Sequence, residues 1–227
     1  EELREKYRQI LRPGKRAVFI CGSTRSGEEE LLLPVYRRLL QATAQAGPKL
    51  VNGLLWIIAP RHLHRLEKIQ QLLRKEDLSY DLLSQCITTG RQQEIVLVDS
   101  IGELANLYAI GDYNFCGGSL VNKGGHNIME PISRYKPVCF GPFIQDFQDA
   151  ADLILATGAG IQVNNSDELA DYLTSLLQDT EAHRQACIAA AKLADMQHGA
   201  AQRQAAIVQR ELTAITSTLS TPPVHSS

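Results

Sequence analysis

Two glycine pairs and a carboxylate lie within one short stretch of the sequence, between an apolar segment and a predicted helix. The pairs are Gly117 with Gly118 and Gly124 with Gly125, and Glu130 follows in the first turn of the helix. Glycine lets backbone N–H groups approach a ligand, because no Cβ stands in the way. The start of a helix adds free N–H groups that favour a phosphate or carboxylate. The stretch predicts an anion site beside a carboxylate, which suits a nucleotide with a phosphate and ribose hydroxyls.

The residues that open this helix could add to the site. Asn127 and Glu130 are three residues apart and therefore share one face of the helix. The alternatives are that Glu130 only offsets the helix dipole and that His126 only caps the helix.

A second segment with anion-binding groups follows the first predicted strand. Ser23, Thr24 and Arg25 stand ahead of a predicted helix start, where hydroxyl and free N–H groups suit an anion. The alternative is an ordinary capping box, in which Ser26 caps the helix and Glu29 reaches back three residues. The two interpretations are compatible, and both stay open.

Two further turns follow predicted strands. Pro60 and Arg61 come after the second strand, and a guanidinium there could reach a phosphate or a base edge. Ile101, Gly102 and Glu103 come after the third strand, where glycine allows close approach of the backbone. For Arg61, the alternative is a solvated side chain. For residues 101–103, the alternative is a helix start with a serine N-cap and Glu103 in the first helical turn.

The elements that position these turns alternate along the chain. Near-continuous apolar segments predict strands at 17–22, 54–59, 94–98, 113–116, 137–140 and 160–163. Apolar residues at helical spacing predict helices at 28–45, 62–75, 101–110, 127–135 and 146–157, followed by C-terminal helices at 167–177, 181–196 and 200–215. Such alternation predicts an α/β fold with a doubly wound, Rossmann-like parallel sheet of about six strands. Ligands of such sheets bind at the carboxyl ends of the strands.

We predict one domain over residues 17–215. Residues 1–16 are polar and predict a short helix or a linker. Residues 216–227 are small, polar and proline-containing, which predicts a disordered tail.

Composition excludes several classes of function. The net charge of −2 gives no global basic field for nucleic acid. The five cysteines show no CxxC or Cys/His ligand spacing, so we predict buried, reduced thiols and no metal site. No apolar run reaches the roughly 18 residues of a membrane span, and the acidic first residues are not those of a signal peptide. We therefore expect a soluble fragment, and the missing initiator methionine suggests part of a longer protein.

The glycine pattern also argues against two common nucleotide sites. A dinucleotide-binding dehydrogenase has G-x-G-x-x-G after its first strand, whereas this chain has G-S-T-R-S-G, and a G-x-x-x-x-G-K-[ST] phosphate loop is absent. The glycine-rich loop follows the fourth strand instead, as in the C-terminal halves of two-domain glycosyltransferases that use nucleotide sugars.

Four motifs resemble one family: the 3-deoxy-D-manno-octulosonic acid (Kdo) transferases of lipopolysaccharide synthesis. The motifs are GSTRSGEEE (22–30), IAPRH (58–62), DSIGELANLYAIGD (99–112) and FCGGSLVNKGGHNIMEPISRYKPVCFGP (115–142). The resemblance covers roughly residues 10–210 and implies the C-terminal, donor-binding half of a GT-B glycosyltransferase. Such an enzyme transfers Kdo from CMP-Kdo to a lipid A precursor, with inversion, at the cytoplasmic face of the bacterial inner membrane.

The resemblance also implies which residues bind the donor. The CMP contacts of the family fall on Pro60, Arg61, Ile101, Gly102, Glu103, Asn127, Ile128, Met129 and Glu130. Beyond the resemblance, the turns themselves suggest further candidate donor contacts at Ser23, Thr24, Arg25, Gly124, Gly125 and His126. Many relatives have a histidine where this chain has Arg25. The catalytic glutamate and the membrane-associating surface of the family lie in the N-terminal half, so we expect no catalytic residue in this chain.

The expected mechanism uses neither metal nor cofactor. Arg61 and the 124–127 backbone would hold the CMP phosphate, Glu130 would accept from the ribose, and the backbone of 101–103 would contact cytosine. The partners are then CMP-Kdo, the N-terminal domain and, through it, the lipid A precursor. The alternatives are a UDP-sugar-binding half of another GT-B enzyme and a non-catalytic nucleotide-binding module, while a dehydrogenase is disfavoured.

Overall fold

Seven parallel strands form one sheet in the order β3-β4-β2-β1-β5-β6-β7. The computed structural model describes residues 2–45 and 53–219, with side chains only as far as residue 199. The strands are β1 Ala17–Thr24, β2 Leu54–Pro60, β3 Asp81–Leu82, β4 Ile95–Leu97, β5 Tyr113–Cys116, β6 Val138–Phe140 and β7 Gly160–Gln162. Without the short edge strand β3, this order runs third, second, first, fourth, fifth and sixth along the chain, as in doubly wound dinucleotide-binding sheets. The predicted α/β class and parallel sheet are confirmed.

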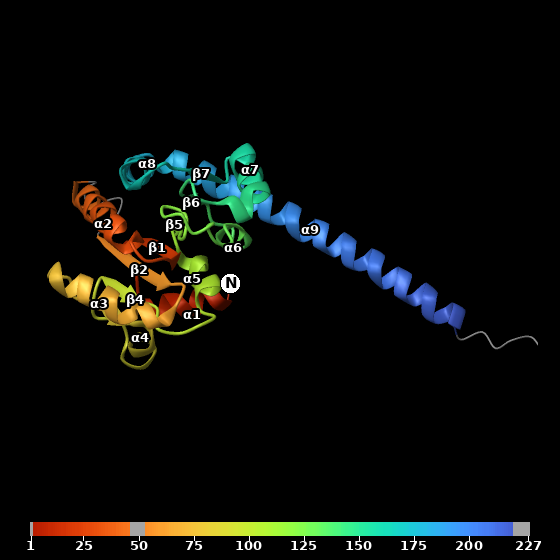
Figure 1. Cartoon of the computed structure of the whole chain (residues 1–227), viewed down its shortest axis with the longest axis horizontal. Helices are drawn as coiled ribbons and strands as arrows, with labels where there is room; N and C mark the ends of the chain where they lie inside the picture. The colour runs from red at the N-terminus through yellow and green to blue at the C-terminus, as the bar shows by residue number, and fades with distance from the viewer. Residues whose placement is uncertain (1, 46–52, 220–227) are drawn as a thin grey trace, which may run out of the picture.

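Helices cover both faces of the sheet (Figure 1). They are α1 Glu2–Leu11, α2 Glu28–Gln45, α3 Leu66–Lys75, α4 Leu83–Thr89, α5 Leu104–Leu107, α6 Met129–Ser133, α7 Gln148–Thr157, α8 Ser166–Gln178 and α9 Thr180–Leu219, with short 3₁₀ turns at Leu63–Arg65, Tyr108–Ile110 and Gln145–Phe147. Helices α2, α3 and α8 lie on one face, and α1, α4, α5, α6, α7 and α9 lie on the other.

Successive side chains of β1 point to opposite faces of the sheet, and both faces are covered by helices. Phe19 and Cys21 point into the core under α2, while Val18 and Ile20 point into the core under α1. Since every one of these side chains is buried, the strand is apolar throughout, without the alternation of a strand that has one wet face.

Several boundaries differ from the sequence prediction. All six predicted strands form, but β3 and α4 were missed because a two-residue strand and a two-turn helix leave no periodic run. The predicted helix at 101–110 is wrong at its start, since α5 begins at Leu104. The two predicted last helices are one helix, α9, which continues to Leu219 and so includes 216–219 of the expected tail. Residues 220–227 lie outside the described residues.

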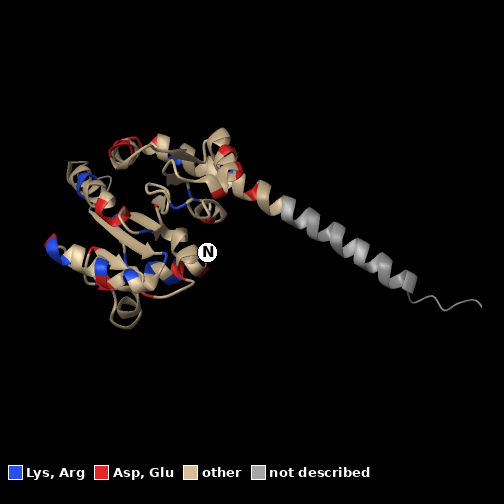
Figure 2. Ribbon diagram, in the orientation of Figure 1, with Lys and Arg blue, Asp and Glu red and all other residues tan. Residues whose placement is uncertain are grey.

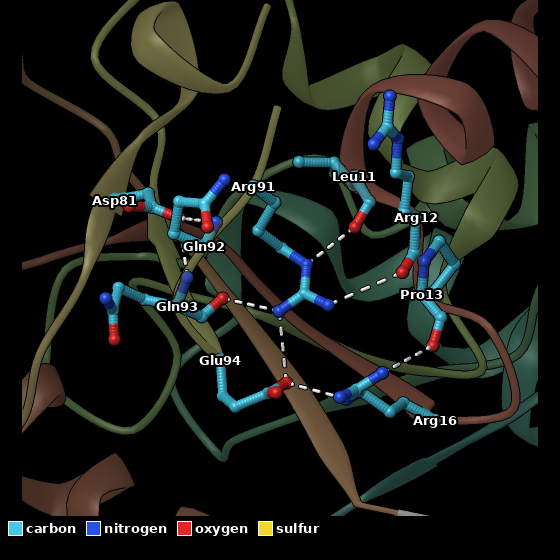
Figure 3. A network of polar contacts seen from close by, with 9 residues as sticks. All are labelled: Leu11, Arg12, Pro13, Arg16, Asp81, Arg91, Gln92, Gln93 and Glu94. Atoms are coloured by element: carbon cyan, nitrogen blue, oxygen red, sulfur yellow. Dashed lines mark hydrogen bonds and ion pairs between the residues drawn. The ribbon is translucent and has the colours of Figure 1, made fainter. Parts of the chain in front are cut away.

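The residues that join α1 to β1 are held at the amino ends of the strands (Figure 3). Tyr7 and Leu11 of α1 are fully buried under the sheet. The Arg91 guanidinium donates to the Leu11 carbonyl at 2.6 Å and to the Glu94 carboxylate at 3.1 Å. Glu94 also pairs with Arg16 at 2.9 Å. These contacts attach residues 2–16 to the domain.

Charges of both signs are spread over the body of the molecule (Figure 2). Among the described helices, none is both long enough and apolar enough to cross a membrane.

Candidate nucleotide site

Loops after four strands meet at the carboxyl edge of the sheet. Gly22 of β1 is opposite Cys116 of β5, and Thr24 of β1 is opposite Pro60 of β2. The chain order reverses between β1 and β5, which is where ligands of such sheets bind. The structure therefore brings the predicted turns to one place.

A pocket of about 240 Å³ lies between the loops after β1, β2 and β4. Five predicted site residues line it: Ser23, Pro60, Arg61, Ile101 and Gly102. The Ile101 side chain is 88% exposed, which leaves an apolar surface at the rim without a protein partner in the described residues. Gly102 has φ +90°, and nothing lies within 4 Å of where a Cβ would be. This turn thus leaves open space beside its backbone for a ligand.

Arg61 and Glu130 bring opposite charges to this edge. Arg61 is exposed, and its backbone N–H donates to the Thr24 carbonyl at 3.1 Å. Burial raises the pKa of the half-buried Glu130, and the charge of Arg61 opposes that rise. Among the described side chains, neither residue forms an ion pair within 4 Å. Both can therefore accept a ligand contact without breaking a salt bridge.

The other residues before α6 have mainly local contacts. The Asn127 side-chain oxygen accepts from the Met129 N–H at 3.1 Å, so Asn127 caps the turn before α6. Ile128 is fully buried, and Met129 packs partly against the core. The Ile128 side chain is therefore part of the core, whereas Asn127 is exposed.

The loop that contains the first glycine pair binds a carboxylate of the protein itself. The N–H groups of Gly118, Ser119 and Leu120 donate to the Glu28 carboxylate at 2.6, 3.0 and 3.0 Å. A Cβ on Gly117 would lie 2.7 Å from the Thr24 Cα, so glycine permits the close approach of the loops after β1 and β5. The amides of this pair are therefore taken before any ligand arrives.

The second glycine pair is required by backbone conformation and by packing. Gly124 and Gly125 have φ +76° and +80°, which side chains rarely adopt. A Cβ on Gly124 would lie 2.5 Å from an Asp146 oxygen, and one on Gly125 would lie 3.1 Å from the Phe143 carbonyl. Protein atoms, rather than open space, thus occupy the room that these glycines leave.

Sequence reasoning missed a buried brace behind the pocket. Both Glu29 carboxylate oxygens bind Arg65, at 3.0 and 2.5 Å, and the Thr24 hydroxyl donates to Glu29 at 2.6 Å. Arg65 also donates to the Thr24 carbonyl at 2.9 Å. The predicted Ser26–Glu29 capping box is therefore wrong. The glutamate run at the start of α2 could not signal this contact, because acidic residues are common in the first turn of any helix.

Arg25, in the loop after β1, contacts the loops after β2 and β5. Its Nε donates to His126 Nε2 at 3.1 Å, and its Nη1 lies 2.6 Å from His62 Nε2. Burial, Arg25 and Arg61 lower the pKa of His126 to about 4. Desolvation and Arg25 also lower the pKa of His62. At neutral pH both imidazoles are therefore uncharged within a cationic cluster.

The Glu103 side chain does not reach the pocket. The Tyr7 hydroxyl donates to its carboxylate, which turns the group towards α1. The expected serine N-cap is also wrong, because Ser100 lines the pocket and α5 begins four residues later. Of this turn, Ile101 and Gly102 face the open space, and Glu103 attaches it to α1.

Known proteins similar in sequence to the chain are longer than it. It is 40% identical over 176 residues to a bifunctional glycosyltransferase/methyltransferase of Fusobacterium nucleatum, which is 76% of this chain and 26% of that protein. It is 34% identical over 165 residues to a 3-deoxy-D-manno-octulosonic acid transferase of Chlamydophila psittaci, which is 72% of this chain and 35% of that protein. The chain thus spans about a quarter to a third of the length of these relatives. No protein-family model matches the sequence.

One solved structure is similar in both fold and sequence. The C-terminal CMP-Kdo binding domain of WaaA from Acinetobacter baumannii has a TM-score of 0.73 with this chain at 26% identity. The match covers 85% of this chain and 96% of that domain.

Proposed function

The chain belongs to the family of 3-deoxy-D-manno-octulosonic acid (Kdo) transferases, and we propose that it is the half of such an enzyme that binds the donor CMP-Kdo. The pocket between the loops after β1, β2 and β4 carries this proposal, because it gathers residues from three of the four family motifs. The WaaA domain, whose fold is similar to that of this chain, is itself named a CMP-Kdo binding domain.

Arg61 is the residue we assign to the CMP phosphate. It lines the pocket, is exposed and has no ion pair among the described side chains. The phosphate gains negative charge as the bond to the sugar breaks, so a guanidinium fixed beside it stabilises the transition state more than the ground state. Arg61 therefore contributes to rate as well as to affinity.

Glu130 and the turn after β4 hold the nucleoside. The half-buried Glu130 carboxylate is an acceptor for ribose hydroxyls, which are donors that CMP presents. The exposed Ile101 side chain and the open Gly102 backbone offer cytosine an apolar surface and a close approach. This binding scheme needs no metal ion, so EDTA should leave the affinity for CMP unchanged.

The rest of the reaction belongs to the whole enzyme. A base on an N-terminal domain would deprotonate an acceptor hydroxyl of a lipid A precursor, and Kdo would be transferred with inversion at the inner membrane. This chain alone should bind CMP weakly and transfer nothing.

Calorimetric titration with CMP tests the assignment. Replacing Glu130 by alanine should weaken CMP binding about 10-fold, since a hydrogen bond to a charged group contributes about 1.5 kcal/mol or more. Glu67→Ala is the matched control, because Glu67 is exposed on α3 and, among the described side chains, bonds only to Gln71. Equal affinities of the two variants for CMP would refute the ribose assignment. Tighter binding of UDP than of CMP would instead favour a UDP-sugar enzyme.

A further inference from the structure

The Arg25 guanidinium bonds to His62 of the pocket wall and has no carboxylate partner among the described side chains. Its side-chain bonds go to the imidazoles of His126 and His62, at 3.1 and 2.6 Å. Within residues 2–45 and 53–199, Arg25 has no carboxylate oxygen within 4 Å. The nearby Glu28 carboxylate binds the Arg25 backbone N–H at 2.8 Å and is otherwise used by the loop after β5.

The two contacts position the guanidinium and leave most of its donors unused. A guanidinium carries five N–H donors in a rigid fork, and each imidazole accepts one. Both imidazoles must be neutral to accept, which agrees with the lowered pKa values of His62 and His126. Three N–H donors thus remain, enough for two parallel bonds to a planar anion.

One arginine therefore lines the pocket and a second is bonded to its wall, which suits a ligand with two anions. Arg61 lines the pocket, Arg25 bonds to the lining residue His62, and the charges of both arginines lower the pKa of His126. An octulosonic acid has its carboxyl group on the anomeric carbon, the same carbon that carries the phosphate in its CMP donor. The second anion of this donor must consequently lie next to the first.

We propose that Arg25, held by His62 and His126, binds the carboxylate of the transferred sugar and selects donors whose anomeric carbon carries an acid group. This inference rests on the proposed function and deepens it. Arg25 is a binding residue here, since it would touch the substrate but take no part in proton transfer.

Binding measurements with two ligands test the proposal. The ligands are freshly prepared CMP-Kdo and cytidine 5′-(methyl phosphate), a diester with the same phosphate charge and no carboxylate. In Arg25→Met, the affinity for CMP-Kdo should fall about 10- to 100-fold, the usual effect of a lost charge-assisted bond. The affinity for the methyl diester should change less than about 3-fold, because Arg61 is intact. Arg25→Lys, which keeps the charge but not the fork, should recover only part of the loss.

The matched control is Arg37→Met, since Arg37 is exposed on α2 and pairs with Glu76. It should leave both affinities unchanged. Equal losses for the two ligands in Arg25→Met would overturn the carboxylate assignment, and so would no loss for either. A wild-type chain that binds both ligands equally well refutes only the carboxylate site. One that binds neither refutes the proposed function as well.

Discussion

Arg91, at the amino ends of the strands, donates to three backbone carbonyls and to Glu94 (Figure 3). At the carboxyl ends of the same sheet, Arg25 and Arg61 have no carboxylate within 4 Å among the described side chains. The Arg91 side chain is 7% exposed, whereas Arg61 is exposed and Arg25 half-buried. Arginine thus has four of its five N–H donors bound by protein groups at one edge, whereas Arg25 and Arg61 keep most of theirs free of the described residues at the other.

Arg65 shows that position at an edge does not decide the role. It lies at the carboxyl edge with Arg61, yet its side chain is only 11% exposed and pairs with the 2% exposed Glu29. Buried polar groups must be hydrogen-bonded, so a buried arginine that is paired in this way serves the fold. An arginine that keeps free donors at a pocket is available to a ligand. The following variants test this distinction.

The largest loss of stability should come from Arg65→Met. It leaves the buried Glu29 carboxylate without its counter-ion, which typically costs about 3–5 kcal/mol. Urea unfolding gives the free energy directly. The double variant with Glu29→Gln should recover much of the lost stability, because no buried charge is then left unpaired. A single variant within 1 kcal/mol of wild type would contradict the assignment of Arg65 to the fold.

A smaller loss is expected for Arg91→Met. Three carbonyls lose a donor, but Glu94 is partly exposed and can bind water, so about 2 kcal/mol is expected. The comparison variant, Arg37→Met, breaks an exposed ion pair and should cost less than about 1 kcal/mol. If the two variants unfolded at the same urea concentration, the contrast between saturated and exposed arginines would fail.

Arg61→Met should weaken CMP binding and leave stability unchanged. Its free energy of unfolding should stay within about 0.5 kcal/mol of wild type, since no described ion pair is lost. Its affinity for CMP should fall about 10-fold or more, as for a lost hydrogen bond to a charged group. Calorimetry and urea unfolding on one preparation check both. Lost stability with unchanged affinity for CMP would show that Arg61 stabilises the fold, as Arg65 does, and does not bind the ligand.

The smallest effect at neutral pH is expected from His126. Its pKa is lowered from 6.5 to about 4 in the folded chain. The unfolded chain therefore binds the proton first, so this contribution to stability is intact above pH 6.5 and is lost as the pH falls towards 4. His126→Gln should leave stability unchanged at pH 7 and flatten its decline in acid. An NMR titration of His126 in the wild type with a pKa near 6.5 would disprove the cationic cluster.

CMP gives a second measurement at His126. A bound phosphate offsets Arg25 and Arg61, so it should raise the pKa of His126. No change in that pKa on saturation with CMP would place the phosphate elsewhere.

The elements that carry the site could largely be predicted from the sequence. Continuous apolar runs identify strands such as β1 and β2, and turn residues at their ends identify Arg61 and Gly102. Those signals are local, because strand burial and left-handed turns depend on the residue itself. The short β3 and the start of α5 were missed, since tertiary packing rather than periodicity defines them.

Apolar periodicity and turn residues are enough to predict the doubly wound sheet, the loops at its carboxyl edge and the residue types within them. Which polar groups already have a hydrogen-bond partner depends on how the chain folds. Glu28 meets Gly118 across 90 residues of chain and takes the amides that looked free for a ligand. Arg65 and Glu29, 36 residues apart, neutralise each other, whereas Arg25 and Arg61 keep donors for a ligand. Local sequence cannot encode this outcome, because a donor or acceptor is satisfied by whichever group folding brings within hydrogen-bond distance.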